Sequence, residues 1–324
     1  MFEFDRGIVD TNLPKSRSAL NCLTHSLYAK ESSLARFIAW LSPEKRGRLL
    51  SIVSSLDAIE GHVFYISAKS LDMLRKIVLK SLDVNRIKTT FISDNDVITA
   101  LATLVVAHGA TNKRFSDSVC VGSRKGVWLR SAFQAAKKIM HLAPQRPEEP
   151  ANSTDSWTTS IVVDARCRLK HITESNYTGN AVFVVPILSK LECMNSCNFE
   201  QALADLASAI RSTVSGISGP SIAQIVDIVS KSPHCYAQAL ANSITNSRKV
   251  VVSNQSRFPL YSVDFGLGRP EWISPVPAFY ANFVSILPKN TRLDGYHVYV
   301  ITSKRTMKHV LSNRIWLEYT SLVY

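Results

Sequence analysis

Segments patterned as β-strands alternate with segments patterned as α-helices along this chain, and this alternation is the feature that most limits its fold. Strand patterns cover residues 64–67, 161–169, 181–188, 249–253 and 295–302. Helical spacing or a helix-start signal marks residues 71–78, 93–109, 199–214, 220–230 and 304–313. An apolar period of two is typical of a strand, whereas a period near 3.6 is typical of a helix. The alternation predicts an α/β architecture in which helices flank a mixed sheet.

The segment 161–169 carries three charged residues on one face. If it is a strand throughout, Asp164, Arg166 and Arg168 point the same way, because alternate side chains share a face. Such a face is usually exposed to solvent, and it could equally line a polar seam between two domains. The segment 181–188 is apolar throughout, which is typical of a buried strand.

Two of the expected helices begin with polar capping signals. Ser93 is a suitable N-cap with Asp96 three residues on, and Gly109 is suited to end that helix. Asn198 and Gln201 have the spacing of a capping box at the start of a second helix.

The chain is long enough to bury a large core, because 46% of its 324 residues are hydrophobic. Residues 1–6 lack the basic start of a signal peptide, and the nearly apolar segment 97–107 is shorter than the roughly 18 residues that cross a bilayer. Six cysteines in a chain of this size are typical of reduced thiols. Cys193 and Cys197 have no second ligand pair at zinc-site spacing. We expect a soluble, cytoplasmic protein without a metal site or membrane contact.

A net charge of +13 raises the possibility of a polyanionic partner. Basic residues with interleaved aromatic residues are concentrated in 111–146, a pattern that suits nucleic acid or a phosphorylated cofactor. We favour a solvated surface, because the chain contains no helix-turn-helix, zinc-finger or RNP-type motif. No nucleic-acid partner is therefore expected, and duplex binding with a steep salt dependence would reverse that view.

The residues alone reveal no catalytic motif. None of the eight histidines begins an H-x-x-x-D pattern, and His108 with Asn112 comes nearest to it. A nucleophile elbow, a P-loop and an H-E-x-x-H motif are also absent from the sequence.

A resemblance to a known family enters through residues 253–270, which contain Asp264-Phe265-Gly266-Leu267-Gly268 followed by Arg-Pro. This segment resembles the D-F-G-W-G signature of the BAHD acyl-CoA-dependent acyltransferases. Three further landmarks of that family occur in the same order, namely Ser93-Asp-Asn-Asp-Val97, Val163-Asp-Ala-Arg-Cys-Arg-Leu169 and Tyr177-Thr-Gly-Asn180.

The resemblance implies a chloramphenicol acetyltransferase-like fold with an incomplete first domain. Residues 1–86 would be a remnant of that domain, and 87–324 would form the C-terminal domain. Phe4-Asp5-Arg6 resembles the element that follows the catalytic helix, so the chain is expected to begin after the family's H-x-x-x-D segment. The catalytic histidine would then be missing.

The resemblance also implies an activity. The family transfers an acyl group from acyl-CoA, a co-substrate rather than a bound cofactor, to a hydroxyl or amine of a small acceptor. We expect the acceptor to belong to secondary metabolism and the protein to be monomeric. The alternative is a non-catalytic remnant that binds acyl-CoA or a protein partner.

Particular residues take expected roles from the family pattern. Ser253, Gln255 and Arg257 are candidates for lining the substrate tunnel, with Ser253 a possible oxyanion donor and Gln255 in place of the family's tryptophan. Asp264, Phe265, Gly266, Leu267 and Gly268 are expected to be structural, with Leu267 keeping an apolar contact and the glycines allowing a bend where a side chain would clash. Arg166 or Arg168 would pair with the aspartate of H-x-x-x-D and couple the domains; without that helix, one of the two should face solvent or a substitute such as Asp164.

Overall fold

The structure is a computed structural model that describes residues 59–84, 91–111, 156–169, 179, 181–190, 198–231, 248–275 and 282–324. Most of the basic stretch 111–146 lies outside these ranges, as do the opening Phe4-Asp5-Arg6 and most of the Tyr177–Asn180 landmark.

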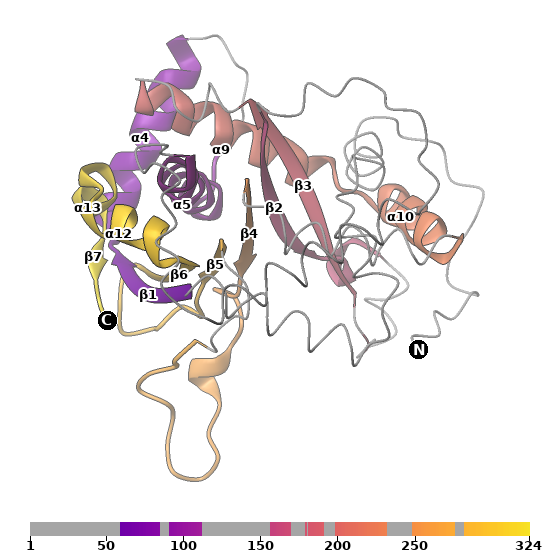
Figure 1. Cartoon of the computed structure of the whole chain (residues 1–324). Helices are drawn as coiled ribbons and strands as arrows, with labels where there is room; N and C mark the ends of the chain where they lie inside the picture. Colours follow the sequence, from indigo (N-terminus) through magenta and orange to yellow (C-terminus); the bar gives the residue numbers. More distant parts are fainter. Residues whose placement is uncertain are drawn as a thin grey trace, which may run out of the picture.

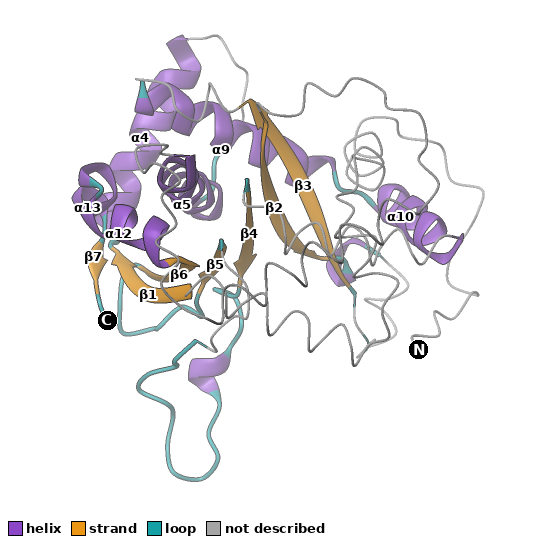
Figure 2. Ribbon diagram, in the orientation of Figure 1, coloured by secondary structure: helices purple, strands orange, loops and turns teal. Residues whose placement is uncertain are grey.

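A seven-stranded mixed sheet organises the described part of the chain (Figure 1, Figure 2). Its order is β3-β2-β4-β5-β6-β1-β7. The strands are β1 (Ile59–Ile66), β2 (Ser156–Asp164), β3 (Val182–Lys190), β4 (Lys249–Asn254), β5 (Phe283–Ile286), β6 (Tyr296–Ser303) and β7 (Ser321–Leu322). The interior strand β4 pairs in parallel with both β2 and β5, whereas the other pairs are antiparallel. The predicted mixed α/β architecture is thus confirmed.

Six α-helices lie among the described residues. They are α4 (Ala68–Val84), α5 (Asp94–Thr111), α9 (Phe199–Gly216), α10 (Gly219–Lys231), α12 (Lys304–Ser312) and α13 (Arg314–Tyr319). Helix α5 is buried on nearly all sides, where it contacts α4, α9, α12 and the strand β4 (Figure 1). A helix that is apolar all round requires such surroundings, because no face of it suits water.

The main core lies between these helices and one face of the sheet. Alternation along β6 shows the two faces: Val298 and Val300 belong to the main core, whereas Tyr299 and Ile301 belong to a small cluster on the opposite face. The Tyr299 ring lies so close to Gly61 that a Cβ there would be 2.5 Å from the tyrosine hydroxyl oxygen.

Both predicted N-cap residues are confirmed. The Ser93 and Asp96 side chains bond reciprocally to each other's backbone N–H groups, and Asn198 accepts from the N–H of Gln201 at 3.1 Å. The expected end at Gly109 is wrong, since α5 continues to Thr111. Gly109 instead permits close packing, because a Cβ there would be 3.0–3.2 Å from atoms of α12.

Two strand predictions need correction. The strand predicted over 161–169 ends at Asp164 and is followed by the 3-10 turn η3 (Arg166–Arg168). The Asp164 carboxylate accepts from the N–H of Arg166 at 3.0 Å, and this local bond favours a turn over continued pairing. The strand 181–188, predicted to be buried, is terminal in the described sheet, so Val182 and Leu188 are exposed.

Candidate functional site at the start of helix α5

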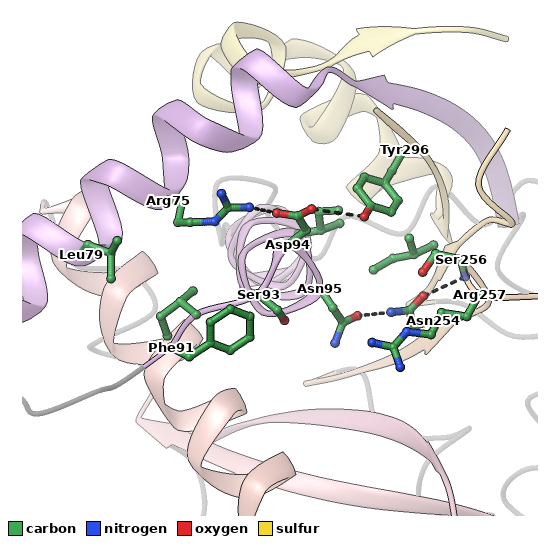
Figure 3. A pocket seen from close by; sticks show the side chains of 13 residues that line it. Arg75, Leu79, Phe91, Ser93, Asp94, Asn95, Asn254, Ser256, Arg257 and Tyr296 are labelled. Carbon is green, nitrogen blue, oxygen red and sulfur yellow. Dashed lines mark hydrogen bonds and ion pairs between the residues drawn. The ribbon is translucent and has the colours of Figure 1, made fainter. Parts of the chain in front are cut away.

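An open pocket of about 490 Å³ lies where the first turn of α5 meets helix α4 and the ends of β4 and β6 (Figure 3). Its apolar lining consists of Leu79, Phe91, Ile92, Ile98 and Ile286. Its polar lining consists of Arg75, Ser93, Asp94, Asn95, Asn254, Ser256, Arg257 and Tyr296. The site therefore has an apolar side and a polar side, which is the usual character of a small-molecule pocket.

Asp94 joins three elements across this pocket. Its carboxylate forms an ion pair with Arg75 of α4 and accepts from the Tyr296 hydroxyl of β6 at 3.2 Å (Figure 3). The ammonium of Lys289 lies 4.9 Å from the centre of the Tyr296 ring, a cation–π distance. Asp94 is thus held by partners on two other elements.

Asn95 joins the same turn to the end of β4. Its side-chain oxygen accepts from the Asn254 amide at 2.8 Å (Figure 3). The Asn254 oxygen in turn accepts from the backbone N–H of Ser256 at 2.9 Å. This chain of bonds fixes the direction in which the polypeptide leaves β4.

The charged groups that line the pocket are two arginines and one aspartate. Arg75 is neutralised by Asp94, whereas the Arg257 side chain is exposed at the pocket edge. The balance is positive, and the first turn of an 18-residue helix adds a partial positive charge. The polar side of the pocket therefore suits an anionic or hydrogen-bonding group.

Of the three predicted tunnel-lining residues, only Arg257 lines this pocket. Ser253 lies one residue before the end of β4 and pairs in register with Ser285. Gln255 follows the strand, and its backbone N–H donates to the Ile286 carbonyl at 2.8 Å. Their roles toward substrate stay predictions.

The Asp264–Gly268 motif lies on a long excursion after β4 that projects away from the body of the protein (Figure 1). The Asp264 carboxylate accepts from the N–H groups of Gly266 at 2.7 Å and Gly268 at 3.0 Å. The bend is present, but the expected clash is not found within the described ranges, because a Cβ on either glycine would meet no described atom within 4 Å. Glycine is required instead by φ values of 93° and 96°.

The apolar side chains of this motif are outside any core among the described residues. Leu267 is 99% exposed and Phe265 is 92% exposed. The expected apolar contact of Leu267 is therefore not found within the described ranges. None of the five motif residues lines the pocket.

The two arginines predicted to couple domains have different surroundings. Arg166 pairs with Asp164 at 3.1 Å and donates to the Gly179 carbonyl, so the anticipated substitute carboxylate is in place. Arg168 donates to the carbonyls of Val214 at 3.0 Å and Ile217 at 2.6 Å, which lie at the C-terminal end of α9. A cation there is favoured by the partial negative charge of a helix end. The coupling role of either residue stays a prediction.

No histidine lines the pocket in the described part of the chain. His108, which begins an H-x-x-x-N pattern with Asn112, instead lies against His309 of α12, which begins the same pattern with Asn313; Nδ1 of His108 and Nε2 of His309 are 2.9 Å apart. Burial and the neighbouring His108 lower the pKa of His309. Burial also lowers the pKa of His297, which packs against the Trp272 ring.

Several pocket residues were not predicted from the sequence. Asp94 and Asn95 were noticed only as part of a helix start, although two polar residues in a first turn are a usable signal for a site. Arg75 and Tyr296 gave no signal, because Arg75 is one of several polar residues on the amphipathic helix α4 and Tyr296 is the first residue of a strand that is otherwise almost entirely buried.

Two further properties concern the described ranges only. They contain no group of three or more His, Cys, Asp or Glu residues placed to hold a metal ion. None of their helices has the length and apolar character needed to span a membrane.

Comparison with solved structures places this fold beside that of Fusarium TRI101. The F. graminearum enzyme with coenzyme A and deoxynivalenol matches with a TM-score of 0.54 at 17% identity, over 88% of this chain and 51% of that one. Its complex with ethyl coenzyme A matches with 0.54 at 18% identity, over 83% and 50%. The F. sporotrichioides enzyme with coenzyme A and T-2 matches with 0.52 at 15% identity, over 83% and 52%. The chain spans about half the length of these proteins and shares their α/β fold.

Comparison with a family model shows which family the chain belongs to. The model of the Transferase family matches residues 142–314, which is more than half of the chain. The chain belongs to this family, that of the BAHD acyltransferases, as the sequence motifs indicated. No curated protein matches it.

Proposed function

We propose that this chain is part of a BAHD-type acyltransferase that moves an acyl group from acyl-CoA to a hydroxyl or amine of a small acceptor. The family match over residues 142–314 carries the proposal. The fold supports it, because the TRI101 structures of the same fold hold coenzyme A together with small-molecule acceptors.

In such a reaction the acceptor oxygen or nitrogen attacks the thioester carbonyl and gives its proton to a general base. The tetrahedral intermediate then collapses, the C–S bond breaks, and CoA leaves as its thiol or thiolate. In our proposal the pocket at the start of α5 holds the polar part of a substrate through Arg257 and the Asn95–Asn254 amides. Phe91 and Leu79 cover an apolar part, and Ser253 remains the candidate donor to the oxyanion.

Residues 1–324 do not contain the histidine that serves as general base in the family. The sequence has no H-x-x-x-D motif, and the described pocket lining has no histidine. Because a positioned base contributes roughly a hundred- to ten-thousand-fold in rate, we propose that this chain alone does not turn over. The absent motif also favours a second candidate function, a non-catalytic protein that binds acyl-CoA or a protein partner.

Other parts of the proposal rest on the family resemblance alone. They are a monomeric state, a cytoplasmic location and an acceptor from secondary metabolism. The net charge of +13 suits CoA phosphates, and we propose no nucleic-acid partner.

Two measurements on residues 1–324 test the proposal. Calorimetric titration with CoA and acetyl-CoA should give saturable binding, and a thiol assay with a panel of alcohols and amines should detect no CoA release. Absence of CoA binding would contradict the proposal and leave the protein-partner alternative.

If the gene encodes an H-x-x-x-D segment upstream of Met1, the same thiol assay on the chain extended by that segment should detect release that is lost when its histidine becomes alanine. Enzyme-dependent release by residues 1–324 alone would show that the base lies within them. His108 would then be the first residue to replace.

A further inference from the structure

An arginine that does not line the pocket contacts the first turn of α5 from a neighbouring helix. Arg211 comes from helix α9, and its Nε and one terminal nitrogen lie 2.8 and 2.5 Å from the same carboxylate oxygen of Asp96. That terminal nitrogen also donates to the Ser93 hydroxyl at 2.6 Å. The Asp96 side chain is fully buried, whereas Arg211 keeps partial solvent access. This contact therefore joins a buried anion on α5 to a cation on a separate helix.

The same carboxylate oxygen closes the cap of α5. It accepts from the backbone N–H of Ser93 at 2.7 Å and from the Ser93 hydroxyl at 2.8 Å. The Ser93 carbonyl accepts in return from the N–H of Asp96 at 3.0 Å and from that of Val97 at 3.2 Å. A buried charge is tolerated where it is paired and hydrogen-bonded. Here one oxygen makes all of these contacts, whereas the other carboxylate oxygen is buried without a hydrogen-bond partner among the described residues.

Two of the pocket residues lie between these two anchors. Asp94 and Asn95 lie between Ser93 and Asp96, so the turn that presents them is held at both ends. Arg211 itself does not line the pocket. Arg211 also lies over the exposed ring of Phe91, another residue that lines the pocket, with its guanidinium carbon 5.2 Å from the ring centre.

Propensity alone would not hold this turn in one conformation. The first N–H groups of a helix lack partners within the helix, so an N-terminal turn unravels readily unless caps satisfy them. Asp94 and Asn95 both have partners that a ligand could displace, namely Arg75 and Asn254. By contrast, neither Arg211 nor Asp96 lines the pocket, so their ion pair lies outside the surface that a ligand would contact.

We propose that Arg211 is a positioning residue for this pocket, acting through Asp96, Ser93 and Phe91 to present Asp94 and Asn95 in one conformation. The identity of the bound ligand rests on the proposed function, whereas the mechanical role of Arg211 does not. Arg211 touches no substrate and takes no part in proton transfer.

The test compares three variants in the 324-residue chain. Arg211→Met removes the cation, Arg211→Lys keeps the charge without the two-pronged geometry, and Asp96→Asn with Arg211→Met removes both charges so that no buried anion is left unpaired. The matched control is Arg292→Met, which breaks an exposed ion pair with Glu271 at 3.4 Å. The readouts are amide hydrogen exchange and CoA binding by calorimetry.

Arg211→Met should accelerate exchange in residues 93–98 by about tenfold or more, in keeping with the loss of hydrogen bonds to a charged group. Residues 100–107 in the middle of α5 should change far less. The double variant should fold and show the same local acceleration, Arg211→Lys should be intermediate, and Arg292→Met should match the wild type. CoA affinity should weaken in the same order, by about tenfold for Arg211→Met.

Two outcomes would overturn the assignment. One is exchange that rises equally along α5 in every folded variant, which is the mark of a general loss of stability. The other is unchanged exchange at 93–98 in folded Arg211→Met or in the double variant. If the wild type binds no CoA, the proposed function fails, yet the exchange pattern still decides the role of Arg211.

Discussion

A buried lysine at the start of the interior strand β4 gives the sharpest test of the energetics of this fold. Lys249 is the first residue of β4, is only 7% exposed, and pairs in register with Thr158 of β2. Burial lowers the pKa of its ammonium group from 10.5 to about 8. The folded protein therefore holds this proton less tightly than the unfolded chain does.

The size and sign of the effect follow from proton linkage. A tenfold change in a protonation equilibrium corresponds to about 1.4 kcal/mol, so the full depression corresponds to about 3 kcal/mol. Below about pH 8 both states carry the proton and the folded state keeps a buried charge. From about pH 8 to about pH 10.5 the unfolded chain binds more protons, so this lysine makes the free energy of unfolding rise with pH.

Lys249→Met should remove this dependence. The free energy of unfolding of the wild type should rise relative to that of the variant by about 2 kcal/mol between about pH 7 and about pH 9.5. Urea unfolding followed by circular dichroism at several pH values measures the difference. Tyrosines whose pKa values are raised by burial, such as Tyr299, titrate in both proteins and cancel in that difference.

Lys308→Met, at an exposed position on α12, is the control and should run parallel to the wild type. If Lys249→Met also runs parallel to the wild type across this range, the argument from burial is refuted.

Two further predictions concern packing and acid stability. Gly295→Ala places a Cβ 2.0 Å from the Ile66 carbonyl oxygen, a backbone clash that should lower the free energy of unfolding by about 1–3 kcal/mol or prevent folding, as a urea titration would show. The pKa of His309 is lowered by burial and by His108, so the unfolded chain binds the proton more readily and stability should fall as the pH drops below about 6.5. His309→Gln should reduce that fall in urea midpoints measured between about pH 7 and about pH 5, and equal slopes would contradict it.

The parts of the fold that the sequence predicted are those decided by local pattern. The caps at Ser93 and Asn198 are short-range hydrogen bonds, and the strand at 249–253 is a short apolar run. The predictions that needed correction concern features set by contacts between distant residues or by a single turn. Gly109 lies inside α5, where it packs against α12, and the end of β2 depends on one aspartate that accepts from a backbone N–H two residues on.

In the candidate site, too, local patterns could be predicted from the sequence, whereas contacts between distant residues could not. Arg257 could be placed through the family motif, because its spacing from Asp264 is read along the chain. The Arg75–Asp94 pair and the Asn95–Asn254 bond join residues from different elements, and no sequence spacing reveals them. Arg211 was the hardest residue to predict. Its contact with Asp96 joins two helices that are far apart in the sequence, and nothing in the sequence distinguishes it from an ordinary surface arginine.

The place of β1 in the sheet has a consequence for how the protein folds. Strand β1 lies between β6 and β7, so Ile59 pairs with Ser303 and Phe64 with Leu322. Because synthesis adds roughly 5–20 residues per second, β1 leaves the ribosome on the order of ten seconds or more before its partners exist. Such distant pairing raises contact order and slows folding. Until β6 arrives, β1 has unpaired edges on both sides, which makes the nascent chain a natural client for chaperones.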